Sequence, residues 1–197
     1  MHAKLLILTT ILGLVNASVR ADLTYSFLDK GSIFDGKSFE TVLLTDLDNG
    51  LTTNMTVTGI GDDLNSNAGG FGIGDDQIDG TSEIIELVFD QDIDFLLIDF
   101  GGVGSDINDG ASLTLGSNSP LNLFTGVSGF NGTSDVYTPP SPVRINSGEK
   151  IVITGSSATS SFDLENISIT VIPEPSSIML VGLTALAAFG IIRRRKK

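Results

Sequence analysis

Carboxylates follow a run of glycines in the segment GGFGIGDDQIDGTSE, which spans residues 69–83. Calcium takes six to eight oxygen ligands in an adaptable geometry, and glycines allow a loop to fold several carboxylates around one ion without side-chain clashes. The segment therefore predicts a calcium site, although its spacing is not that of an EF-hand. A solvated acidic loop is the alternative, because aspartate is abundant throughout the chain. The predicted calcium ligands are Asp75, Asp76, Asp79 and Glu83.

The spacing of Gly70, Gly72 and Gly74 does not indicate a phosphate-binding loop. No lysine and no helical pattern follow these glycines, whereas a phosphate loop uses the N–H groups of a helix start and a nearby cation. The aspartates beside them would also repel a phosphate. We expect the glycines to form a turn that wraps a cation or a solvated hairpin loop.

Histidine and cysteine, on which many catalytic sites depend, are absent between residues 22 and 172. The single histidine is His2 and the chain has no cysteine, which excludes Ser-His triads, cysteine nucleophiles and the common zinc sites. Paired carboxylates remain, as in glycosidases. Sugar clefts usually also present stacking aromatic rings, and the chain has no Trp and only two Tyr residues. We therefore expect no enzymatic activity.

A carbohydrate-binding or carbohydrate-active secreted domain is the alternative function. It predicts a surface groove lined by Tyr25, Tyr137 or exposed phenylalanines, because aromatic rings are the usual stacking surfaces for sugars. A third alternative is a structural subunit that polymerises through the edge strand of an open sheet.

Short runs of alternating or β-branched apolar residues, separated by Gly, Asn, Asp and Ser, predict that residues 22–172 are built from strands. In the run NMTVTGI, Met55 and Val57 point to one side while the asparagine and threonines around them point to the other, as in a sheet with one solvated face. No segment in this range has a helical period. The predicted strands are residues 23–28, 39–45, 52–60, 83–90, 95–100, 111–115, 121–125, 150–154 and 161–172.

These short strands with polar turns predict an all-β fold, a β-sandwich of the jelly-roll type, with a closed barrel as the alternative. The last strand changes its pattern midway. Phe162 and Leu164 share one parity, whereas Ile167 and Ile169 share the opposite one. We therefore predict a β-bulge at Glu165-Asn166 that restores the inward register.

The N-terminal sequence MHAKLLILTTILGLVNASVRA indicates a secretory signal peptide, residues 1–21. It has a cation at Lys4, an apolar run at residues 5–15, and small residues at Ala17 and Ala21 that fit a cleavage site. The run is too short to cross about 30 Å of hydrocarbon at about 1.5 Å per residue. Cleavage after Ala17 or after Ala21 fits, and we prefer Ala21 because the strand pattern begins directly afterwards.

The domain at residues 22–172 is strongly acidic, with twenty-three Asp and Glu residues and a net charge of −19. Such a field repels nucleic acid and anionic lipid and attracts cations, so nucleic-acid binding is excluded. Although export would permit disulfides, the chain has no cysteine to form them. The cations of the domain are Lys30, Lys37, Arg144 and Lys150.

Residues 173–197 combine three elements in a fixed order, namely Pro173-Glu174-Pro175, an apolar segment at 178–192 and a basic cluster. They resemble the PEP-CTERM sorting signal of Gram-negative bacteria. The resemblance implies that the apolar segment is a transient transmembrane helix, that the basic cluster stays cytoplasmic, and that an exosortase cuts near the Pro-Glu-Pro motif. Positive charges at the end of a hydrophobic helix are held on the cytoplasmic side, which agrees with this order. The basic cluster is Arg193, Arg194, Arg195, Lys196 and Lys197.

The middle region GGFGIGDDQIDGTSEIIELVFDQDIDFLLIDFGG is similar to the β-sandwich domains of other exported proteins with this sorting signal. The shared pattern is a Gly-x-Gly stretch, an Ile-Asp-Gly and a Glu that precedes a strand ending in Phe-Asp. This resemblance supports the fold and implies no activity. Its carriers are Gly72, Gly74, Ile78, Asp79, Gly80, Glu83, Phe89 and Asp90.

Together these features predict an exported, non-catalytic protein that is sorted to the outer envelope or the extracellular matrix. Its expected partners are the secretion machinery, an exosortase and the membrane, at least transiently, with exopolysaccharide as a further candidate. An uncut single-pass anchor is the alternative for the tail. Calcium is the one cofactor that the residues suggest.

Overall fold

The computed structural model describes residues 21–47, 50–68, 70–75, 77–103, 110–124, 129–131 and 135–172 of the 197-residue chain. Antiparallel strands predominate in these residues, which confirms the all-β class. The predicted signal-peptide helix and the predicted transmembrane helix at 178–192 lie outside the described residues. Within the part of the chain that is described, no helix is long and apolar enough to cross a membrane.

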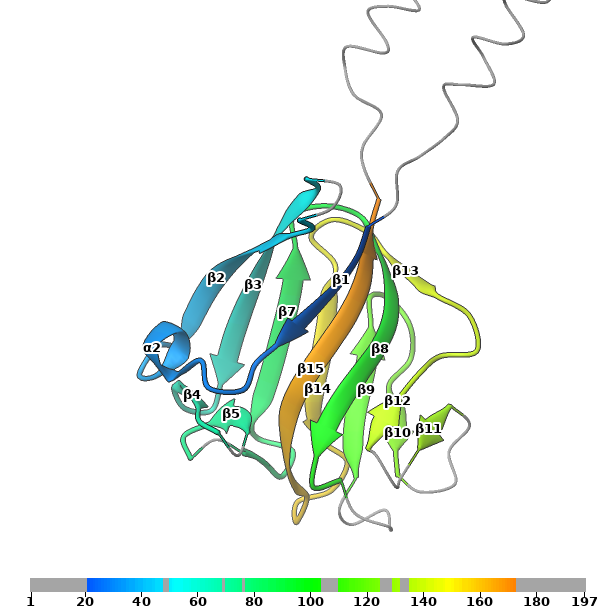
Figure 1. Ribbon diagram of the computed structural model, residues 1–197. Coiled ribbons are helices and arrows are strands. Elements are labelled where there is room, and N and C mark those ends of the chain that lie inside the picture. Colours follow the sequence, from blue (N-terminus) through cyan, green and yellow to red (C-terminus); the bar gives the residue numbers. More distant parts are fainter. Residues whose placement is uncertain are drawn as a thin grey trace, which may run out of the picture. The chain divides into compact units, whose positions relative to one another are not determined.

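One large sheet has six antiparallel strands in the order β10-β9-β14-β7-β3-β2 (Figure 1). The late strand β14 lies between β9 and β7, so the centre of this sheet depends on contacts between residues distant in sequence. Its strands are β2 (Phe39–Thr45), β3 (Thr52–Ile60), β7 (Ile84–Phe89), β9 (Ala111–Leu115), β10 (Leu121–Leu123) and β14 (Lys150–Gly155).

A second sheet has seven strands, with the path β1-β15-β8-β12-β11 and with β13 paired to β8 and β6 paired to β15. The long strand β15 lies between β1 and β8 and pairs with both. Its strands are β1 (Ala21–Ser26), β6 (Ile78–Asp79), β8 (Ile93–Gly101), β11 (Phe130–Asn131), β12 (Val136–Tyr137), β13 (Val143–Ile145) and β15 (Ser161–Val171).

The two large sheets face each other across one hydrophobic core (Figure 1). Met55 and Val57 of β3 are fully buried, as the alternation in their strand predicts, and so are Ile167 and Ile169 of β15. Each such side chain contributes roughly 1.5–3 kcal/mol by leaving water. Packing of this kind is the main stabilising force in a chain without cysteine.

An aromatic cluster joins β1 to the short helix α2 (Gly31–Phe34) and to a hairpin of β4 (Leu64–Ser66) and β5 (Phe71–Ile73). Phe27, Phe34 and Phe71 are fully buried, and their ring centroids lie 4.8 to 6.2 Å apart. The sequence has no helical period in this range, and α2 does not produce one because its four residues form only about one turn.

The predicted bulge in β15 is confirmed. The pairing with β8 shifts between Leu164, which faces Phe100, and Asn166, which faces Asp99, so that Glu165 has no partner in the ladder. This extra residue allows both halves of β15 to point their apolar side chains into the core. A second irregularity, between Ser168 and Ile169, was not predicted.

Candidate functional site

Three glycines of the predicted loop, at positions 70, 72 and 74, each have a steric or backbone role. A β-carbon on Gly72 would lie 2.2 Å from the carbonyl oxygen of Gln77, and one on Gly70 would lie 2.4 Å from the β-carbon of Asp163. Gly74 has a φ of +71°, a conformation that L side chains rarely adopt. The glycines therefore permit close approach and tight turning in the fold, whether or not an ion binds.

The predicted calcium ligands follow this turn. The backbone N–H of Asp79 donates to Oε2 of Glu83 at 2.7 Å. Burial raises the pKa of Glu83, and the nearby charges of Asp79, Asp75 and Asp62 raise it further. Within the described ranges, no three acidic or histidine side chains are arranged to hold a metal ion. Asp76 lies outside the described residues, so the calcium site stays a prediction.

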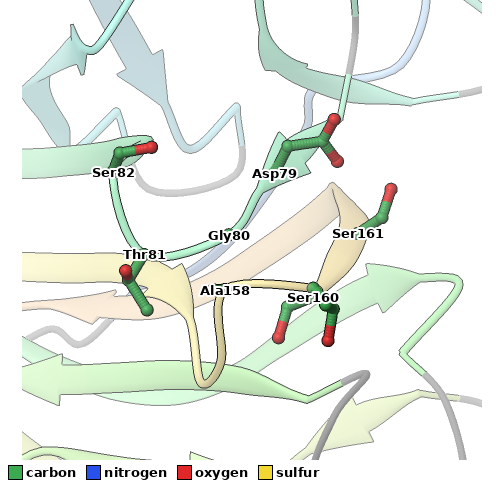
Figure 2. A pocket seen from close by; sticks show the side chains of 8 residues that line it. Asp79, Gly80, Thr81, Ser82, Ala158, Ser160 and Ser161 are labelled. Carbon is green, nitrogen blue, oxygen red and sulfur yellow. The ribbon is translucent and has the colours of Figure 1, made fainter.

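A polar cleft of about 360 Å³ lies between the turn after β6 and the loop that leads into β15 (Figure 2). Backbone hydrogen bonds hold the turn in place, because the N–H of Gly80 donates to the carbonyl of Ser160 at 2.7 Å and the N–H of Gly155 donates to the carbonyl of Gly80 at 2.8 Å. The cleft offers hydroxyl groups and one carboxylate for hydrogen bonding. Its lining residues are Asp79, Gly80, Thr81, Ser82, Ala158, Thr159, Ser160 and Ser161.

A second cavity, of about 260 Å³, is more apolar and lies where β9 and β10 of one sheet approach β12 and β13 of the other. Tyr137 lines it with an exposed fraction of 6%, and its ring stacks on Phe95 with centroids 6.5 Å apart. Burial raises the pKa of Tyr137. The lining residues are Leu113, Leu115, Asn118, Ser119, Leu121, Tyr137 and Val143.

Tyr25 lines neither of these two cavities. Its half-buried ring meets Phe27 edge-on with centroids 4.9 Å apart, and burial raises its pKa to about 12. Its hydroxyl has no hydrogen-bond partner among the described residues. Tyr25 and Tyr137 therefore do not combine into the aromatic groove that the carbohydrate alternative predicts.

Three carboxylates that sequence reasoning missed lie near one another where β8 pairs with β12 and β15. Burial raises the pKa of Glu165, and the charges of Asp99 and Asp135 raise it further. Burial and the charge of Asp99 also raise the pKa of Asp135. Nδ2 of Asn166 donates to Oδ2 of Asp99 at 3.0 Å. None of the three carboxylates lines either of these two cavities.

The ends of the domain leave it side by side. Ala21 faces Val171 in the β1–β15 ladder, and the N–H of Ile172 donates to the carbonyl of Asp92 at 3.0 Å. The Pro-Glu-Pro motif at residues 173–175 follows directly in the sequence. The motif and the basic cluster, Arg193 to Lys197, lie outside the described residues.

Residues 171–196 match the family model of the PEP-CTERM protein-sorting motif. The C-terminal tail therefore carries this sorting motif, as the three-part resemblance implied. The motif supports sorting to the cell envelope, with an exosortase as the processing partner and a membrane-anchored precursor as the exported species. No curated protein and no solved structure showed significant similarity to the chain.

Proposed function

We propose that residues 22–172 form a non-catalytic β-sandwich of the jelly-roll type that is exported, processed at both ends and delivered to the outer envelope or the extracellular matrix. The observation that carries this proposal is the sorting motif at residues 171–196, which begins at the last residue of β15. Two sheets that share one hydrophobic core support the sandwich.

The short connection between the domain and the apolar segment supports processing close to the membrane. Only the five residues 173–177 separate Ile172 from the apolar segment at 178–192 in the sequence. Because Ala21 lies beside Val171, the signal peptide and the sorting segment connect to the same end of the domain. An exosortase in the membrane would therefore meet its motif directly after the last residues of the domain in the chain.

Charge supports the departure of the domain after processing. Cleavage near the Pro-Glu-Pro motif would remove the apolar segment together with the basic cluster at 193–197, leaving a domain with a net charge of −19. An anionic membrane surface repels such a domain once the hydrophobic anchor is gone. The composition therefore suits a protein that functions away from the membrane.

The residues available for chemistry support a role without catalysis. Residues 22–172 contain no histidine and no cysteine. The carboxylates whose pKa is raised, Glu83, Asp135 and Glu165, line neither of the two cavities, whereas a catalytic acid and base must reach one substrate.

The processing proposal is tested in the native host by following the protein after the motif at 173–175 is replaced by three alanines. Thr184→Ala is the matched control, because it changes the tail while keeping the membrane segment apolar. We expect the control and the unmodified protein to lose the tail and leave the inner membrane, and the triple variant to accumulate as a membrane-bound precursor. Deletion of the exosortase gene should have the same effect as the triple variant. Normal processing of the triple variant would overturn the proposal in favour of a different protease or an uncut anchor.

The hydroxyl-lined cleft favours carbohydrate binding as a second candidate, since hydroxyls and a carboxylate can hydrogen-bond a sugar without an aromatic platform. Exopolysaccharide purified from the host is the ligand to titrate into the protein. Asp79→Asn together with Thr81→Val should weaken binding, whereas Thr114→Val on β9 should not. No heat of binding with the unmodified protein would exclude this candidate for that polysaccharide.

A further inference from the structure

The more apolar of the two cavities lies beside a break in the pairing along β8. The short strands β12 and β13 pair with the same side of β8, where Tyr137 faces Ile98 and Val143 faces Phe95. The segment between them, residues 138–142, contains three prolines, which have no N–H group to donate to a ladder. The pairing therefore stops between Tyr137 and Val143, and both residues line the cavity of about 260 Å³.

Leucines of the six-stranded sheet form the opposite wall. Leu113 and Leu115 of β9 are buried, and Leu121 of β10 pairs with Leu113. Asn118 and Ser119, in the turn between β9 and β10, are exposed and supply the polar part of the lining. No charged residue among those that the structure describes lines this cavity. Its walls are therefore apolar, and its polar groups are neutral.

Tyr137 gives the cavity a buried hydroxyl without a partner. The residue is 6% exposed. Burial is the one cause of its raised pKa, and no hydrogen bond with another described residue contributes. A buried hydroxyl that is left unpaired lowers stability, so a ligand oxygen that accepts its hydrogen bond would be favoured.

The charge of the domain favours a neutral ligand. With a net charge of −19, the domain repels anions, and no cation lines the cavity to compensate. Arg144 follows Val143 in the sequence, and its guanidinium already pairs with Asp94 at 2.8 Å. A cationic ligand would have to leave water for an apolar site that offers no carboxylate.

We propose that this cavity binds a neutral molecule with one apolar ring, or an alkyl group of similar size, and one oxygen that accepts a hydrogen bond from Tyr137. Apolar protein cavities of about 150 Å³ take up benzene, so about 260 Å³ leaves room for a ring with one substituent. Because proline fixes φ, the segment at 138–142 has little freedom to lose when a ligand binds. The site is separate from the hydroxyl-lined cleft and does not depend on the sorting of the protein.

The test is thermal unfolding of the protein isolated from its native host, with benzyl alcohol, toluene or benzoate. These compounds share one ring and differ in their oxygen atoms and charge. At five times its dissociation constant, benzyl alcohol should raise the Tm by roughly 2–4 °C. Toluene should also raise the Tm, because it meets the same apolar walls. Benzoate should give no rise, because the acidic domain repels it.

Three variants locate the site. Val143→Phe should fill the cavity and abolish the rise with both neutral compounds. Val152→Phe is the matched control, because it adds the same ring on the outer face of β14, between the buried Ile151 and Ile153, and should keep the rise. Tyr137→Phe should weaken the binding of benzyl alcohol about two- to tenfold without weakening that of toluene, because only a hydrogen bond is lost.

Three results would overturn the proposal. The first is no rise in Tm with benzyl alcohol at up to about 5 mM. The second is a rise that Val143→Phe retains, since the ligand would then bind elsewhere. The third is a Tyr137→Phe variant, which lacks only one oxygen, that binds both neutral compounds as the unmodified protein does, or a benzoate effect equal to that of benzyl alcohol.

Discussion

Replacement of Gly101 by alanine tests the packing between β8 and β15 through one steric conflict. Gly101 faces Asp163 in the ladder, and an added β-carbon would lie 1.9 Å from Oδ1 and 2.7 Å from Cγ of Asp163. Gly101 is not among the glycines with positive φ, so alanine is compatible with its backbone. The steric conflict is therefore the main source of any loss of stability.

The size of the effect follows from two opposing contributions. Overpacking of this kind typically lowers the free energy of unfolding by about 1–3 kcal/mol, because Asp163 or the strand must shift to restore a normal contact. Alanine also reduces the conformational entropy of the unfolded chain, which raises the free energy of unfolding by about 0.4–1 kcal/mol. The difference leaves a net loss between about 0 and about 2.6 kcal/mol, and its midpoint of about 1.3 kcal/mol lowers the Tm of a domain of this size by roughly 3–5 °C.

Thermal and urea unfolding of residues 22–172 expressed alone provide the assay. Gly101→Ala combined with Asp163→Ala should recover most of the lost stability, which appears as a coupling free energy in a double-mutant cycle. Gly70→Ala is the informative comparison, because its β-carbon would meet the β-carbon of Asp163, which Asp163→Ala retains. Gly70→Ala combined with Asp163→Ala should therefore recover less stability than Gly101→Ala combined with Asp163→Ala. A stable Gly101→Ala variant, or strictly additive losses, would refute the steric explanation.

Three further predictions concern charge. Because burial and neighbouring carboxylates raise the pKa of Glu165 above its ordinary value of 4.5, its ionised form opposes folding. As the pH falls from neutral to about 4.5, the free energy of unfolding of the unmodified protein should rise relative to that of Glu165→Gln. Parallel profiles of stability against pH for the two proteins would contradict this. If calcium binds at the predicted site, it should raise the Tm more than magnesium does. The Asp76→Asn/Asp79→Asn double variant should lose this difference, and equal effects of the two ions on the unmodified protein would refute the site. The net charge of −19 predicts higher stability in 0.1 M sodium chloride, where screening acts within about 10 Å, than in very low salt, and a fall would refute it.

The strands that the sequence predicts best are those with several alternations between core and solvent. The predicted bounds of β2, β3 and β9 match the structure, and β15 differs by one residue at its end. Their side chains alternate for five or more residues, which suffices to define a buried face. The bulge at Glu165 could be predicted for the same reason, because it reverses the parity of a long apolar pattern.

Short elements depend on partners that a local pattern cannot identify. The strands β4, β5, β6, β11, β12 and β13 have two or three residues each and were not predicted. A side chain at position 70 would clash with Asp163, which lies far along the chain, so the need for Gly70 cannot be found from a local pattern. In the same way, Asp99, Asp135 and Glu165 approach one another only through the pairing of β8 with β12 and β15. The sorting motif could be predicted from sequence because its three elements are linear.

The mass of the intact protein purified from its native host tests the central claim most directly. Cleavage of the signal peptide and of the sorting segment predicts a single species that begins near Asp22 and ends between Pro173 and Ser176. A species that begins at Ser18 would correct only the signal-peptide cleavage site, since Ala17 also fits. A majority of molecules that retain Lys197 would contradict the claim, because the tail would then be a permanent anchor.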